Sequence, residues 1–149
     1  MDIEKDVHNI INYSHKYAKN MLNTEKEYYP FGAKIDNNGD LIAVGYHDNE
    51  TECPENKKAI EELTAVFERE LNTGDIKAYA LTYNVRLKTD HLKGKATAIL
   101  IDIYHRHSNK IPKYYFTYSW NENDELIFGE SFGIKKKNKI STSAQLVLQ

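Results

Sequence analysis

The chain has 149 residues, of which 40% are apolar and 28% charged, and its formal net charge is −2. This composition is typical of one globular domain over residues 1–149 and excludes intrinsic disorder. The slight acidity gives no general attraction to nucleic acid or an anionic membrane, so we expect neither as a partner. The single cysteine excludes an internal disulfide and a cysteine zinc cage. An acidic N-terminus and the lack of a long apolar run predict a cytoplasmic protein.

Residues 2–24 are expected to form an amphipathic helix. Apolar residues recur every three or four positions, beginning with Ile3 and Val7. Two histidines of this segment, His8 and His15, are seven residues apart. Metal-binding histidine pairs on a helix are usually closer in sequence, so we interpret both as surface residues.

A β-hairpin and a second helix follow. Alternating apolar residues before and after the turn sequence DNNG at 36–39 predict a hairpin within residues 27–48. The second helix is expected to begin near Pro54, which suits the first helical position, and to end at Gly74.

The apolar period changes to two after the second helix. Four alternating segments separated by short polar turns predict an antiparallel meander, with strands near residues 76–87, 96–107, 113–120 and 126–132. Residues 134–149 either add an edge strand or form a frayed tail.

These elements predict an α+β fold in the order α-β-β-α-β-β-β-β. Each helix has one apolar stripe, so we expect both to pack on one face of an antiparallel sheet of about six strands. The other face would then remain open, and we expect it to be the functional surface.

The open face is expected to carry polar and aromatic side chains. Asp102 lies in the middle of a strand, where a carboxylate is uncommon unless it is paired or solvated. Arg86 and Arg106 are candidate cross-strand partners for it. The face could be a solvated surface with ion pairs, a binding surface, or the site of an acid/base pair. The candidate binding residues are Asn84, Arg86, Asp102, Tyr104, Arg106 and Tyr118.

His105 and His107 have the best local spacing for a metal, because residues two apart on a strand share a face. Two ligands are too few for a metal centre, and His47, His91 or Asp90 would complete the set only if loops converged. We therefore expect strand-end histidines and neither a metal nor another cofactor. The basic run at residues 135–139 is interpreted as solvated charges after an edge strand.

Several short segments resemble a family of small bacterial α+β proteins with no assigned activity. They are residues 27–33 (EYYPFGA) with the following hairpin, 83–87 (YNVRL), 105–106 (HR) and 128–132 (FGESF). The resemblance covers residues 25–133 and implies the fold and a bacterial intracellular setting. The family pattern has Asp where Asn84 stands and Glu where Tyr104 stands. Both differences remove a carboxylate, which argues against acid/base work at these positions.

The expected function is that of a non-enzymatic bacterial domain which binds a protein partner, or a second copy as a homodimer. Binding would use the open sheet face or a sheet edge, and an immunity-type or adaptor role fits by analogy of class alone. The alternative is a small-molecule-binding protein or enzyme with a polar pocket around Arg86, Asp102, His105 and Arg106. Tyr29 is a further candidate for lining a ligand pocket.

Overall fold

The computed structural model describes residues 2–45, 56–88, 95–136 and 145–148. The elements are α1 (Ile3–Glu25), β1 (Phe31–Asp36), β2 (Leu41–Val44), α2 (Asn56–Thr73), β3 (Ile76–Lys88), β4 (Lys95–His105), β5 (Lys113–Trp120), β6 (Leu126–Ile134) and β7 (Gln145–Leu148). The predicted α+β class and the predicted order of the first eight elements are confirmed.

Local side-chain interactions explain where the first elements begin and end. Asp2 accepts a hydrogen bond from the Lys5 backbone N–H at 3.1 Å and so caps α1. In the turn between β1 and β2, one carboxylate oxygen of Asp36 accepts from the N–H groups of Asn38 and Asp40. Gly39 has a φ of +89°, a conformation that glycine adopts without strain. The predicted hairpin is therefore confirmed.

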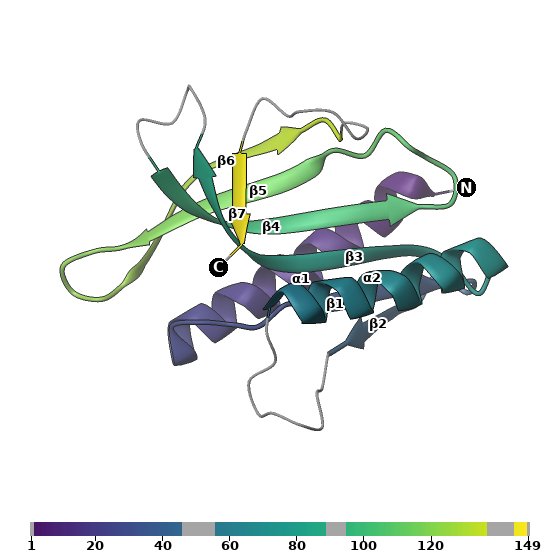
Figure 1. Cartoon of the computed structure of the whole chain (residues 1–149), viewed down its shortest axis with the longest axis horizontal. Coiled ribbons are helices and arrows are strands. Elements are labelled where there is room, and N and C mark those ends of the chain that lie inside the picture. Colours follow the sequence, from purple (N-terminus) through teal and green to yellow (C-terminus); the bar gives the residue numbers. More distant parts are fainter. Residues whose placement is uncertain (1, 46–55, 89–94, 137–144, 149) are drawn as a thin grey trace.

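The strands form one antiparallel sheet in the order β2-β1-β3-β4-β5-β6 (Figure 1). The long strand β3 pairs with β4 along its length and with β1 over residues 76–82. Beyond the end of β1, β7 pairs with β3 over residues 85–88. Residues 145–148 thus form a strand, one of the two alternatives expected for the tail.

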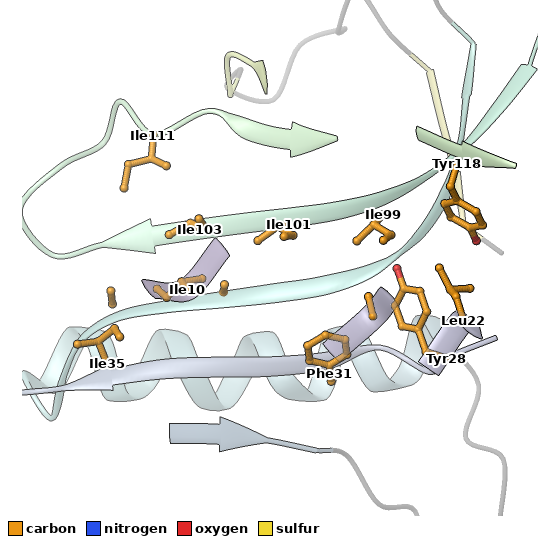
Figure 2. Close-up of a cluster of buried hydrophobic side chains, with 13 residues drawn as sticks. Ile10, Leu22, Tyr28, Phe31, Ile35, Ile99, Ile101, Ile103, Ile111 and Tyr118 are labelled. Atoms are coloured by element: carbon orange, nitrogen blue, oxygen red, sulfur yellow. The ribbon is translucent and has the colours of Figure 1, made fainter. Parts of the chain in front are cut away.

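The two helices lie on opposite faces of the sheet, so the prediction that both pack on one face is wrong. Figure 1 shows α2 in front of β1 and β3, with α1 behind the sheet. On the α1 face, Ile10 and Leu22 belong to one buried cluster with Ile99, Ile101 and Ile103 of β4 (Figure 2).

The α2 face has its own buried cluster. Leu63 and Phe67 of α2 pack with Tyr79 and Leu81 of β3 and with Leu100 of β4. A Cβ atom built on Gly32 of β1 would lie 2.5 Å from the ring of Phe67, so α2 crosses β1 in close contact.

The reason for the wrong prediction is that β3 is buried on both sides. Ala78, Ala80 and Thr82 face α1, and all three are fully buried. Because these side chains are small and only weakly apolar, the sequence pattern favoured an open sheet face at these positions. In the fold, small side chains allow a helix to pack close to the sheet, and the larger Ile side chains of β4 add apolar contacts to the same cluster.

The two histidines of α1 differ in their surroundings. His8 is exposed, as predicted, and hydrogen-bonds Asn12. His15 is half-buried, with its ring 4.7 Å from that of Phe116 and 4.8 Å from that of Phe128, so it is less exposed than the prediction of a surface residue implies. In the described ranges, neither helix combines the length and the apolar character needed to cross a membrane.

Candidate functional site

Asp102 is the centre of the candidate site. It lies in the middle of β4, on the face that α2 covers, and is only 5% exposed. Its cross-strand neighbours are Leu81 on β3 and Lys113 on β5. Four tyrosines of the same face surround it at diagonal or alternate positions: Tyr79, Tyr83, Tyr104 and Tyr115. A carboxylate in such a place needs partners that compensate for the lost water.

The partners of Asp102 are incomplete. The hydroxyl of Tyr104 donates to Oδ2 of Asp102 at 3.1 Å. The ammonium of Lys136 lies 3.3 Å from Oδ1 and forms an ion pair with it. Oδ1 is nevertheless buried without a hydrogen-bond partner among the described residues. We call Asp102, the four tyrosines and Lys136 the Asp102 site.

Aromatic rings continue from the helix to the ammonium group. The ring of Phe67 in α2 stacks on Tyr79 at a centroid distance of 5.0 Å, and Tyr79 stacks on Tyr104 at 5.0 Å. Nζ of Lys136 lies 3.5 Å from the centroid of the Tyr104 ring, a cation–π geometry. Lys136 also donates to the backbone oxygen of Ile103. The ammonium thus has a carboxylate, a carbonyl and a ring face as partners.

Burial and the charge of Asp102 change the protonation of the neighbouring groups. Burial raises the pKa of Tyr104 far above its usual range, and the charge and hydrogen bond of Asp102 add to this effect. Burial, followed by the negative charge of Asp102, raises the pKa of Tyr115 to about 12. Burial lowers the pKa of Lys136, while Asp102 acts against this. The hydroxyls of Tyr104 and Tyr115 therefore remain protonated at neutral pH and can donate hydrogen bonds.

A cleft of about 320 Å³ opens next to Asp102, between α2 and the sheet. Its wall combines Asp102 and tyrosine rings with the second carboxylate Glu68 and the apolar side chain of Leu71. The volume is at the lower end of the range for small-molecule sites. The lining residues are Ile60, Thr64, Glu68, Leu71, Asn72, Tyr79, Leu81, Tyr83, Asp102 and Tyr104.

Neither predicted arginine partner pairs with Asp102. Arg86 is exposed and pairs across the strands with Thr97, on the α1 side of the sheet. Arg106 follows β4, and its guanidinium donates to the side chain of Asn37 at 2.6 Å and to the backbone oxygens of Gly74 and Ile76 at 3.1 and 2.7 Å. Arg106 therefore connects the end of β4 to the turn between β1 and β2 and to the start of β3.

The remaining predicted surface residues are also divided between the two faces. Asn84 pairs with Ile99 on the α1 side, whereas Tyr104 faces α2. The hydroxyl of Tyr118 donates to the side-chain oxygen of Asn84 at 2.9 Å. These two residues and the exposed Tyr29 line a separate cavity of about 740 Å³ near the end of α1. The prediction of one shared polar face is therefore wrong.

His105 does not belong to the Asp102 site or to the cavity beside Tyr29. It is buried on the α1 face, and its Nε2 lies 2.8 Å from the carboxylate of Asp6 in α1. Its Nδ1 accepts from the backbone N–H of His107 at 3.1 Å, so Nε2 carries the proton and donates to Asp6. Lys77 lies 3.4 Å from the same carboxylate. Both ring nitrogens are used, and the pair connects α1 to β4.

Tyr29 and His105 are far apart, so they cannot line one pocket. His105 contacts Asp6 in the first turns of α1, and Tyr29 follows its last turn. A helix rises 1.5 Å per residue, so about twenty residues separate the two regions by roughly 30 Å. The residues considered as a third metal ligand, His47, His91 and Asp90, lie outside the described residues. Within those residues, no three side chains of His, Cys, Asp or Glu are grouped as a metal site would require.

Sequence reasoning missed most of the Asp102 site. Lys136 belongs to the basic run that we interpreted as solvated, and Asp6 was not considered as the partner of His105. The signal that was available is the carboxylate at mid-strand, together with Tyr79 and Tyr83 on one face of β3. Only the alignment of Leu81 with Asp102 between β3 and β4 shows that the two tyrosines lie beside the carboxylate.

Comparison with known proteins adds no assignment to this geometry, and the family resemblance noted in the sequence stays a prediction. No protein-family model, no curated protein and no solved structure matches this chain.

Proposed function

We propose that this chain is a non-enzymatic binding protein and that its ligand occupies the cleft between α2 and the sheet. The observation that carries the proposal is the buried carboxylate of Asp102, whose Oδ1 has no hydrogen-bond partner among the described residues. The ion pair with Lys136 compensates this oxygen only in part, because a buried carboxylate oxygen that makes no hydrogen bond does not replace the bonds it had to water. A ligand that donates a hydrogen bond in the cleft would replace them.

The cleft is preferred to the larger cavity near the end of α1 because of its charge. The charged residues in the wall of the larger cavity, Lys26 and Glu27, are exposed. Lys26 is also occupied there, since it donates to the backbone oxygen of Asp124 at 2.8 Å and lies 4.2 Å from the centroid of the Trp120 ring. A buried charge beside aromatic rings orients a ligand more strongly than exposed charges, which water screens.

The proposal is tested by a ligand screen on variants that fill the cleft. Small molecules in cationic, neutral and anionic groups would be screened by thermal shift against the protein and against Thr64→Phe. Thr64 lines the cleft. We expect at least one class to raise the melting temperature of the protein but not of Thr64→Phe. A ligand at 100 times its Kd stabilises by about 2.7 kcal/mol, which is readily measured.

The control is Val66→Phe on the same helix. Val66 is 42% exposed and is not part of the cleft wall. Val66→Phe adds the same ring to α2 without filling the cleft, so ligand binding should remain as in the parent protein. If no class binds, or if Thr64→Phe binds as well as Val66→Phe, the cleft is not the binding site.

A second candidate function is pairing of two copies through the sheet edge at β6. In the described part of the chain β6 pairs only with β5, and its residue Ile127 is 46% exposed. An uncovered edge strand with an exposed β-branched residue favours edge-to-edge association. Light scattering after size exclusion tests this candidate: a dimer that Ile127→Lys dissociates would support it, and a monomer at high concentration would reject it.

A further inference from the structure

Lys136 already occupies one side of the Asp102 site. It lies two residues beyond the end of β6, and its side chain is 19% exposed. Its ammonium reaches Asp102 and the Tyr104 ring, two residues that also line the cleft. The chain therefore places an alkylammonium group where the wall of the cleft can bind one.

The groups around this ammonium favour a primary alkylammonium over a quaternary one. A carboxylate oxygen and a backbone carbonyl accept hydrogen bonds, and the ring of Tyr104 attracts positive charge. A quaternary ammonium could use the ring but has no N–H group for the two oxygens. Glu68 adds a second negative charge in the cleft wall, which favours cations there.

The internal lysine does not fully satisfy Asp102. Although Nζ lies 3.3 Å from Oδ1, this contact is an ion pair without hydrogen-bond geometry. Burial also disfavours the charged form of Lys136 and lowers its pKa. A free ammonium that enters from the cleft could orient an N–H group toward Oδ1 without the constraint of the chain.

We propose that the cleft binds a small compound with a primary alkylammonium group, and that Lys136 competes with this ligand for Asp102. The proposal rests on the proposed function, because it names the ligand class of the same cleft. The tethered lysine acts at a high effective concentration, of about millimolar order for short tethers. The ligand must therefore displace it, and the measured affinity is lower than that of the vacant site.

The test is a calorimetric titration with n-butylammonium chloride. Matched probes are 1-butanol, which lacks the charge, and tetramethylammonium chloride, which lacks the N–H donors. We expect butylammonium to bind more tightly than both. In Lys136→Met, which keeps a long unbranched side chain but removes the charge, its Kd should fall about tenfold or more because the competitor is gone. The control Lys135→Met removes the exposed neighbouring charge and should leave the Kd unchanged.

A second measurement on the unmodified protein guards against misfolding of Lys136→Met. Nuclear magnetic resonance of isotope-labelled lysine side chains follows the Lys136 ammonium directly. Addition of butylammonium should move its signal toward that of solvent-exposed lysines. If butylammonium binds but neither this signal nor the Lys136→Met affinity changes, competition by Lys136 is rejected.

The outcomes separate the ligand class from the proposed function. Butanol binding as tightly as butylammonium would overturn the ammonium proposal. If compounds of another charge class bind and only Thr64→Phe abolishes their binding, the cleft is a binding site with a different ligand class. If no compound binds in the cleft, the proposed function fails and the ammonium proposal fails with it.

Discussion

Substitution of Gly32 by alanine tests the packing of α2 on the sheet. The added Cβ atom would lie 2.5 Å from two ring carbons of Phe67 and 3.3 Å from the backbone oxygen of Ala80. The ring has little freedom to move, because Phe67 is 1% exposed and stacks on Tyr79. Overpacking of this kind costs about 1–3 kcal/mol, and we expect Gly32→Ala to lower the free energy of unfolding by that amount.

The origin of the loss is shown by a double-mutant cycle. Phe67→Ala alone should cost about 3–5 kcal/mol, since it leaves a cavity in the α2 face. In that background Gly32→Ala should cost nothing or be favourable, because the space that its methyl group needs is then empty. The coupling free energy between the two sites is therefore expected to be about 1–3 kcal/mol.

The assay is chemical denaturation followed by circular dichroism, with the midpoint and the m-value fitted separately. Gly45→Ala is the control, because a Cβ atom at this exposed glycine has no heavy atom within 4 Å. If Gly32→Ala is as stable as Gly45→Ala, α2 does not cross β1 in the way described. The placement of the Asp102 cleft beneath α2 would then be wrong as well.

Three further predictions follow from the buried polar groups. Asp6→Ala leaves the Nε2 proton of His105 without its acceptor, so it should cost about 1–3 kcal/mol in chemical denaturation. Tyr118→Phe removes the hydroxyl that donates to Asn84 and should cost about 1 kcal/mol by the same assay. Burial, together with the charge of Asp102, raises the pKa of Tyr115 from 10 to about 12, so its contribution to stability is complete below pH 10 and is lost as the pH rises through 12. Denaturation at stepped alkaline pH, with phenolate absorbance recorded in parallel, should show this decline.

Each of these predictions has a control. For Asp6→Ala the control is Asp6→Asn, whose amide oxygen can still accept the hydrogen bond from Nε2 of His105 and should restore most of the stability. For Tyr118→Phe it is Tyr17→Phe, at a position that is 40% exposed and should be neutral. If Tyr118→Phe is as stable as the parent protein, the hydrogen bond from Tyr118 to Asn84 is worth no more than the bond that the hydroxyl makes to water in the unfolded chain. If Tyr115→Phe shows the same alkaline decline as the parent protein, other groups cause it.

The alternation within each strand could be predicted well, but the alignment between strands could not. The pattern of β4 correctly placed Ile101 and Asp102 on opposite faces. The wrong step was to join Asn84 and Arg86 of β3 to the face of Asp102. A shift of one residue between two strands exchanges the faces, and alternation alone does not determine that shift.

The long-range contacts of the candidate site could not be predicted from the sequence for a similar reason. Lys136 lies outside the regular strands, in a run of lysines that are alike in sequence. Which of them turns inward depends on where β6 ends relative to Asp102 and Tyr104. Asp6 meets His105 only because α1 runs across the sheet, and helix periodicity does not give that direction.

The central position of β3 has a consequence for backbone exchange with solvent. Its N–H and C=O groups are shared among three other strands, β1, β4 and β7, and side chains from both helices pack on it. Opening β3 therefore requires the sheet to separate on both sides at once, which approaches global unfolding. Amide protons of β3 should exchange with deuterium at the slowest rates in the protein, whereas those of the outer strands β2 and β6 should exchange through local fraying.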